Sequence, residues 1–232
     1  MDPKLRIVLL PGLDGTGRLF EEFANSLSRR YAVEIIDYPP EEILSYEALL
    51  DIVTRRLPSA DYVLVGESFS GPLALRIAAR NPKSLKAVVL GASFARLDLP
   101  FKSMLGKLAA MVPVRAVPSV VLDALLMNGR ATRDERLRLK RILRGIGPGV
   151  LAARARAALS VDLVADGVVV DKPVLYLRAA HDRLIPSTAA DLVSTLARDF
   201  SVREIPAPHF LFPIEPARAA DEIDEFLATR IR

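Results

Sequence analysis

Short aliphatic runs alternate with helical patterns along the first part of the chain, and this alternation constrains the fold more than any other feature. Each run is apolar at consecutive positions, which is typical of a parallel strand buried on both faces. The predicted strands are residues 5–10, 32–38, 61–65 and 87–90, and the helices between them are residues 19–27, 45–57 and 72–80. Strand followed by helix in this order predicts a parallel sheet with helices on both faces and right-handed crossovers.

The alternation stops after Ser93. Residues 95–164 hold helical stretches broken by prolines and glycines, with no run typical of a buried strand. The pattern resumes with predicted strands at 174–177 and 201–205 and predicted helices at 189–198 and 216–230. We therefore expect an α/β fold, with a core domain of residues 1–94 and 165–232 and a helical cap of residues 95–164 inserted after the fourth strand.

Composition excludes several classes of site. The 232 residues suit one domain, and the absence of cysteine excludes disulfides, thiolate metal sites and a cysteine nucleophile. No apolar run approaches the roughly 18 residues of a membrane span. The start has neither the long apolar stretch nor the cleavage site of a secretory signal. We expect a cytoplasmic protein without a metal or cofactor.

The formal net charge is +4, and much of the basic excess lies between Lys102 and Arg156. A basic chain raises the question of nucleic acid as a partner. No zinc-finger spacing, RNA-binding aromatic motif or long basic run accompanies the charge, so we expect no nucleic-acid partner. A solvated basic helical face within the predicted cap is the simpler interpretation.

The segment 63–71, Val-Leu-Val-Gly-Glu-Ser-Phe-Ser-Gly, indicates chemistry most directly. An apolar strand enters a Gly-x-Ser-x-Ser sequence and leaves straight into a helix, with small residues two places either side of Ser68. Such a turn exposes the serine hydroxyl and needs small neighbours for strand and helix to approach each other. The alternative is a tight strand-to-helix turn without catalytic meaning.

With this nucleophile elbow the sequence resembles the α/β-hydrolase superfamily, and the resemblance extends over nearly the whole chain outside the cap. Ser70 stands where that superfamily usually has a glycine. The resemblance implies Ser68 as nucleophile, His209 after the last strand as general base, and Asp182 in a strand-end loop as the acid that orients the histidine. His181, the other histidine of the chain, is the competing base, and Asp98 is the runner-up acid.

Residues 10–17, Leu-Pro-Gly-Leu-Asp-Gly-Thr-Gly, follow the first strand, where the superfamily places its oxyanion loop. The resemblance implies that the backbone N–H groups of Leu13 and Phe69 bind the oxyanion. A phosphate cradle is the alternative, but the glycine spacing fits neither a dinucleotide fingerprint nor a Walker loop. The superfamily sheet normally opens with two antiparallel strands. Here the oxyanion strand comes first, so we expect a trimmed sheet of about six parallel strands.

A serine nucleophile argues against the epoxide and halide branches of the superfamily and favours acyl transfer. We predict a carboxylesterase-like hydrolase that forms an acyl-enzyme on Ser68 from small to medium aliphatic esters. The aliphatic segment 105–127 either packs the cap or lines an acyl pocket, and the basic cap suggests an acidic acyl carrier protein as partner. Thioesterase, acyltransferase and perhydrolase activity, or a non-catalytic binding role, stay open.

Overall fold

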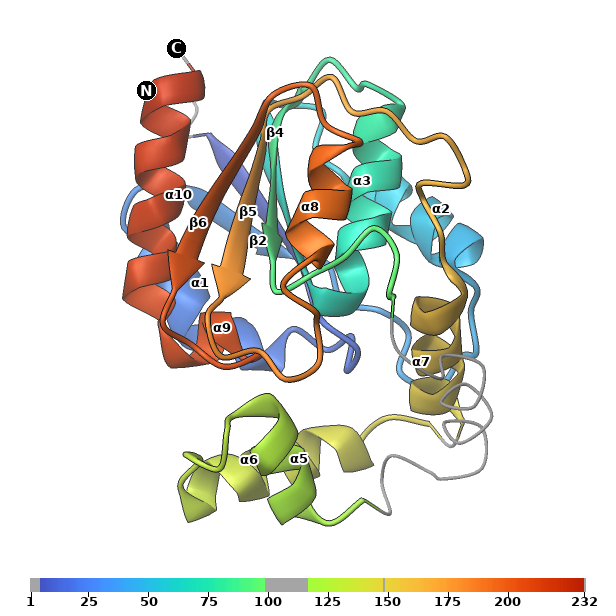
Figure 1. Cartoon of the computed structure of the whole chain (residues 1–232), viewed down its shortest axis with the longest axis vertical. Coiled ribbons are helices and arrows are strands. Elements are labelled where there is room, and N and C mark those ends of the chain that lie inside the picture. The colour runs from blue at the N-terminus through green and yellow to red at the C-terminus, as the bar shows by residue number, and fades with distance from the viewer. Residues whose placement is uncertain (1–4, 99–116, 148, 232) are drawn as a thin grey trace.

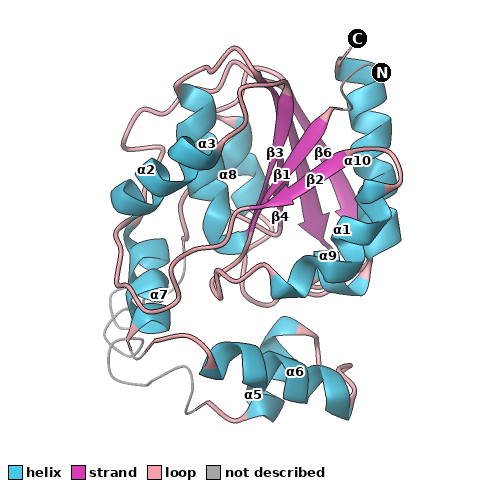
Figure 2. Cartoon of the chain, turned by 180° about the vertical axis from the view of Figure 1, so that it is seen from behind, coloured by secondary structure: helices cyan, strands magenta, loops and turns pink. Residues whose placement is uncertain are grey.

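The computed structural model describes residues 5–98, 117–147 and 149–231 and contains one six-stranded sheet (Figures 1 and 2). All five strand pairings are parallel, which confirms the predicted trimmed parallel sheet. The strands lie in the order β2-β1-β3-β4-β5-β6. Their bounds are β1 Arg6–Leu10, β2 Ala32–Ile35, β3 Tyr62–Glu67, β4 Leu85–Gly91, β5 Val174–Ala179 and β6 Phe200–Ile205.

Helices cover both faces of the sheet, as Figures 1 and 2 show. One face carries α1 (Glu21–Ser28), α9 (Leu211–Ile214) and α10 (Pro216–Arg230), and the other carries α2 (Tyr46–Arg56), α3 (Gly71–Ala79) and α8 (Ala189–Ser194). Side chains alternate along a strand, so β1 sends Ile7 and Leu9 to the first face and Val8 and Leu10 to the second. Consecutive apolar residues in β1 are therefore buried in two separate cores.

Two predicted elements differ from the structure. Residues 18–28 form a 3₁₀ turn, η1 (Arg18–Phe20), followed by α1, where one helix was predicted. Strand β2 ends at Ile35, three residues before the predicted end, because the Tyr38 N–H leaves the sheet and donates to the Gly15 carbonyl at 2.8 Å. The apolar side chains of Ile36 and Tyr38 are buried in the core on the second face of the sheet, although neither residue belongs to the strand.

The strand order places the ends of β1 and β3 together. Strand β1 pairs with β2 on one side and with β3 on the other. The strand order therefore switches at β1, with β2 on one side and all later strands on the other. The register sets Leu10 opposite Gly66, which brings the segment after Leu10 beside the segment after Gly66. Ligand sites of open α/β sheets lie at the carboxyl ends of strands at such a switch point.

Between β4 and β5 the described residues form α5 (Ser119–Leu126), α6 (Arg133–Arg144) and α7 (Val150–Ser160). A capping box between Thr132 and Glu135 begins α6. Figure 1 shows α5 and α6 beyond the carboxyl ends of β5 and β6. Part of the predicted aliphatic segment, residues 105–116, lies outside the described residues. None of the described helices is long and apolar enough to cross a membrane.

Candidate active site

Ser68 lies in a strained turn at the end of β3. Its φ angle is +46°, a left-handed conformation that is uncommon for a residue with a side chain and is typical of functional turns. The turn continues as η2 (Ser68–Ser70) and then as α3. A Cβ on Gly66 would lie 2.9 Å from the Ser70 carbonyl oxygen, so only glycine fits where strand and helix approach each other.

The structure brings Ser68, His209 and Asp182 into one hydrogen-bonded relay. Ser68 Oγ lies 3.0 Å from His209 Nε2, and His209 Nδ1 lies 2.8 Å from Asp182 Oδ2. The backbone N–H groups of Leu184 and Ile185 donate to Asp182 Oδ1 at 2.8 and 3.0 Å. Each oxygen of the carboxylate therefore has its own partners, which fixes the plane in which it faces the imidazole.

The relay is shielded except at the serine. The side chains of His209 and Asp182 are 5% and 6% exposed, whereas Ser68 is partly exposed. An imidazole shielded from water can turn neither toward solvent nor toward another acceptor. The hydroxyl that is open to solvent is thus the one that the imidazole can deprotonate.

The competing base and acid lie elsewhere. His181 is exposed, and its backbone carbonyl accepts a hydrogen bond from Asn128 Nδ2 at 3.0 Å. Asp98 is exposed and accepts two hydrogen bonds of 2.8 Å from the Arg96 guanidinium. The structure brings neither of them to Ser68, so the geometry favours His209 and Asp182.

A second set of hydrogen bonds holds the backbone of the elbow. Ser93 Oγ donates to the Ser68 carbonyl at 2.6 Å, and the Tyr176 hydroxyl donates to the Ser93 carbonyl at 2.6 Å. A Cβ on Gly71 would lie 1.7 Å from Ser93 Oγ, so the glycine after Ser70 makes room for this contact. Sequence reasoning missed Ser93, because a serine two residues beyond a glycine at a strand end carries no signal of its own.

The Ser70 side chain is small enough for the turn, and its hydroxyl also makes two contacts. Its hydroxyl donates to the Pro11 carbonyl and also contacts the Tyr38 hydroxyl. All three groups are buried. The serine that replaces the usual glycine therefore ties the elbow to the loop after β1, a role that the sequence analysis did not assign to it.

The loop after β1 lies against the elbow, with Leu13 in its turn. The Gly12 N–H donates to Glu67 Oε2 at 3.2 Å, and the Gly12 carbonyl accepts from the Gly15 N–H at 3.0 Å. No described residue accepts a hydrogen bond from the Leu13 N–H, and Phe69 directly follows the nucleophile. The two N–H groups predicted to form the oxyanion hole come from the two segments that the β1–β3 register juxtaposes.

Glu67 is a buried carboxyl group next to Ser68 in the chain. Burial, assisted by the nearby Asp14 carboxylate, raises its pKa to about 8, although the hydrogen bond from the Gly12 N–H acts in the opposite direction. Glu67 is therefore largely uncharged at neutral pH. Glu67 occupies a position of the elbow motif where any residue is allowed, so the sequence did not indicate that its carboxyl group is buried and largely uncharged.

The described residues contain no cluster of three or more histidine and acidic side chains able to hold a metal ion. The groups that the structure brings together are a serine hydroxyl, an imidazole and a carboxylate. This constellation supports nucleophilic attack by Ser68 with proton transfer through His209.

Among curated proteins the chain is similar to two enzymes of ester chemistry. It is 26% identical over 203 residues to the pimeloyl-[acyl-carrier protein] methyl ester esterase of Nitrosomonas europaea, covering 80% of each chain. It is 35% identical over 91 residues to phytyl ester synthase 1 of Arabidopsis thaliana, covering 36% of this chain and only 13% of that protein.

Among solved structures the chain is similar to a thermophilic esterase from Thermogutta terrifontis, with a TM-score of 0.81 at 18% identity over 98% of this chain and 91% of the other. At that identity the likeness shows a shared fold. The sequence also matches the alpha/beta hydrolase family over residues 7–222, a span that takes in β1, the elbow, Asp182 and His209. Because the match covers most of the chain and the parallel sheet agrees with it, the protein belongs to the alpha/beta hydrolase family.

Proposed function

We propose that the protein is a serine hydrolase that cleaves carboxylic esters through an acyl-enzyme on Ser68. The observation that carries the proposal is the relay from Ser68 Oγ to His209 Nε2 at 3.0 Å and from His209 Nδ1 to Asp182 at 2.8 Å. A serine hydroxyl is a weak nucleophile at neutral pH and needs such a base.

In the proposed reaction Ser68 Oγ attacks the ester carbonyl while His209 Nε2 takes the hydroxyl proton. The negative charge that develops on the carbonyl oxygen is bound by the N–H groups of Leu13 and Phe69. His209 then returns the proton to the leaving alkoxide, which departs as the alcohol. Water, deprotonated by His209, hydrolyses the acyl-enzyme by the same steps, and Asp182 stabilises the imidazolium in each half.

Apolar side chains beside the site support an aliphatic acyl group. Leu13, Leu126 and Phe210 are partly buried and pack against a cluster formed by the helices between β4 and β5. The Phe210 N–H donates to the Leu126 carbonyl at 3.0 Å, which holds this apolar wall next to His209. We expect kcat/KM to rise from acetate to medium-length p-nitrophenyl esters. A strict preference for acetate, or for a charged acyl group, would contradict this assignment.

The decisive experiment is hydrolysis of p-nitrophenyl butyrate by the wild type, Ser68→Ala and His209→Gln. We expect each variant to lose about 10⁴-fold or more in kcat, since removing one member of such a relay disables the unit. The matched controls are Ser28→Ala, at an exposed serine of α1, and His181→Gln, at the exposed histidine. Activity that survives in Ser68→Ala would show that Ser68 is structural.

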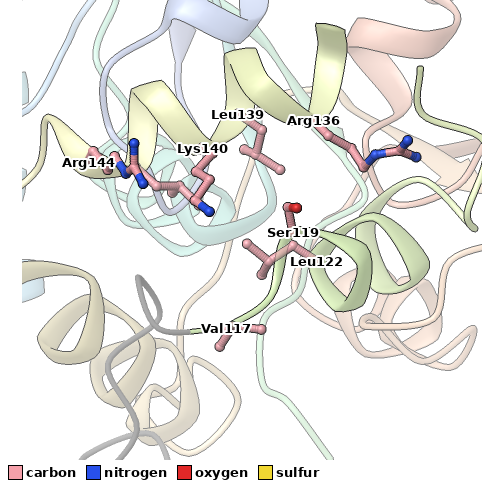
Figure 3. Close-up of a pocket in the computed structure, with 8 residues that line it drawn as sticks. Val117, Ser119, Leu122, Arg136, Leu139, Lys140 and Arg144 are labelled. Carbon is pink, nitrogen blue, oxygen red and sulfur yellow. The ribbon is translucent and has the colours of Figure 1, made fainter. Parts of the chain in front are cut away.

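A second candidate substrate is an acyl ester carried by an acidic protein. Four arginines of α6 are exposed: Arg133, Arg138, Arg141 and Arg144. Arg138 and Arg141 line an open groove of about 540 Å³ against η1 and α1. Figure 3 shows Lys140 and Arg144 on the same helix, at a small pocket where Leu139 of α6 and Leu122 of α5 line the wall. One relative bears the name of an acyl-carrier-protein ester esterase.

Salt dependence separates the two candidates. Hydrolysis of an ester bound to acyl carrier protein should lose rate steeply with added salt, because attraction between exposed charges is screened within about 8 Å at physiological ionic strength. Arg141→Gln, at an arginine without an ion-pair partner among the described residues, should lower kcat/KM for the carrier-bound ester while leaving p-nitrophenyl butyrate unaffected. Equal salt dependence for both substrates would count against the carrier.

A further inference from the structure

Arg154 on α7 is a buried cation. It is 2% exposed, although no carboxylate of the described residues lies within ion-pair distance of its guanidinium. Burial lowers the pKa of Arg154, but a guanidinium remains protonated in proteins. Burying a charge raises the free energy of the folded state unless the group is fully hydrogen-bonded. The hydrogen-bond partners of Arg154 therefore indicate its role.

Two of its three partners are backbone carbonyls of the loop that carries Leu13. Arg154 Nη1 donates to the Asp14 carbonyl at 2.7 Å and to the Leu13 carbonyl at 3.1 Å. Nη2 donates to the Pro39 carbonyl at 3.0 Å, and the guanidinium carbon lies 5.6 Å from the centre of the Tyr38 ring. The three hydrogen bonds and the contact with the Tyr38 ring hold the guanidinium in one position.

Gly15 is adapted to this contact in two ways. Its φ angle is +71°, and a Cβ at this position would lie 2.3 Å from Arg154 Nη1. The Gly15 N–H closes the turn onto the Gly12 carbonyl at 3.0 Å. The turn from Gly12 to Gly15 is thus held by its own hydrogen bond and, from outside, by Arg154.

The geometry of this turn determines where the Leu13 N–H points. That N–H shares a planar trans peptide unit with the Gly12 carbonyl, so the two groups point in opposite directions. Gly15 holds the Gly12 carbonyl, and Arg154 holds the next carbonyl along, that of Leu13 itself. Rotation of the Gly12–Leu13 peptide unit would break the hydrogen bond from the Gly15 N–H and turn the Leu13 N–H to a new direction. Arg154 binds the carbonyls of the next two peptide units, which join Leu13 to Gly15, and so keeps the Gly15 N–H where it holds the Gly12 carbonyl.

We propose that Arg154 is a positioning residue for ester hydrolysis: it locks the Gly12–Gly15 turn so that the Leu13 N–H is preorganised to bind the oxyanion. The proposal rests on the proposed function. It makes α7, one of the helices between β4 and β5, part of the machinery that stabilises the transition state. Preorganised donors of this kind contribute most in the transition state, where the oxyanion carries its full charge.

The test compares Arg154→Met, which retains much of the side-chain volume but donates no hydrogen bond, with the wild type. The control is Arg156→Met, at an exposed arginine of the same helix. We expect Arg154→Met to lose about 10²-fold in kcat for p-nitrophenyl butyrate with KM changed by less than about threefold. The inhibition constant of a butyl trifluoromethyl ketone, whose adduct with Ser68 places an oxyanion in the hole, should rise by a similar factor.

Two further measurements separate positioning from loss of folding. Thermal unfolding reports whether Arg154→Met is folded at the assay temperature. If it is not, Arg154→Lys, which keeps the charge but cannot reach three carbonyls at once, is measured in its place. Guanidinium ion at millimolar concentration should restore part of the rate of a folded Arg154→Ala variant and leave the wild type unchanged.

The outcomes are distinct. A folded variant with unchanged kcat, or with reduced kcat but unchanged affinity for the trifluoromethyl ketone, would overturn the positioning role. In that case Ser68 of the wild type still reacts with a fluorophosphonate, and the proposed function stands. A wild type that neither hydrolyses esters nor reacts with the fluorophosphonate would overturn the proposed function, and this inference with it.

Discussion

The Tyr46 ring stacks on the Phe69 ring, with centroids 4.7 Å apart and planes inclined by 17°, while its hydroxyl donates to the Phe69 carbonyl at 2.9 Å. Tyr46 begins α2, and Phe69 follows Ser68, the proposed nucleophile. One side chain of α2 thus holds both the ring and the backbone of the residue whose N–H is proposed to bind the oxyanion.

We expect Tyr46→Phe to lower the free energy of unfolding by about 1 kcal/mol, because the stacking is retained and only the hydrogen bond to the Phe69 carbonyl is lost. Tyr46→Leu, which also removes the stacked ring, should cost about 1 kcal/mol more. Urea denaturation measures both, with Tyr62→Phe in β3 as the control. Equal costs for the two variants would mean that the stacking contributes nothing.

Asp182→Asn tests the acid of the relay. An asparagine keeps the size of the side chain but favours the wrong imidazole tautomer, so kcat should fall about 10⁴-fold with little change in KM. Asp98→Asn is the matched control and should stay within about threefold of the wild type. Comparable losses in the two variants would assign the acid to neither residue.

Glu67 should make the folded state sensitive to alkali. Its pKa rises from an ordinary value of 4.5 to about 8 on folding, so between these values the folded chain holds a proton that the unfolded chain has released. Its contribution to stability is therefore complete below about pH 4.5, falls by up to about 1.4 kcal/mol per pH unit as pH rises, and levels off above about pH 8.

Glu67→Gln should remove this decline, because the amide keeps an acceptor for the Gly12 N–H and has no proton to lose. The measurement is the free energy of unfolding in urea at several values between about pH 5 and about pH 9. Glu22→Gln, at an exposed glutamate of α1, serves as the control. If the wild type and Glu67→Gln have parallel pH profiles, Glu67 is not the group that titrates.

Gly71→Ala should destabilise the fold by about 1–3 kcal/mol, because the added Cβ would lie 1.7 Å from Ser93 Oγ and 2.7 Å from Ser93 Cβ. Removing the Ser93 side chain as well, in the double variant with Ser93→Gly, should recover part of this loss although it sacrifices the hydrogen bond to the Ser68 carbonyl. Gly145→Ala, at an exposed glycine, is the control. Strictly additive effects in the thermal unfolding of the double variant would contradict the proposed clash.

The sequence predicted the elements that depend on local pattern. The aliphatic runs identified all six strands, and the helix predicted for residues 216–230 has the observed bounds of α10. Periodicity could not separate η1 from α1, since Phe20 and Phe23 lie on one buried face in either conformation. Periodicity could not predict the end of β2 at Ile35 either. The Tyr38 N–H leaves the sheet to donate to the carbonyl of Gly15, which lies in a distant turn.

At the candidate site, too, residues in local motifs could be predicted and residues placed by long-range contacts could not. Ser68, Asp182 and His209, which the structure brings together, could be named as candidates because each lies in a segment with its own motif or at the end of a strand. Arg154 lies in a helix with one other arginine, and nothing in the sequence distinguishes it from that residue, exposed Arg156. Its role depends on the packing of α7 against a turn some 140 positions earlier in the chain, as the contact to Asp14 records. Single-sequence patterns do not contain such long-range contacts.

The register that pairs Leu10 with Gly66 determines which segments of this protein can change in length. A strand advances about 3.3 Å per residue, so inserting one residue between Leu10 and Gly12, or between Gly66 and Ser68, would displace the serine from the oxyanion loop by about the length of a hydrogen bond. Segments that do not bear on this pairing, such as the exposed turn at Gly129 between α5 and α6, should tolerate changes in length far better. Substrate preference in such a protein can therefore diverge through the helices between β4 and β5 while the two strand ends that align the reacting atoms stay unchanged.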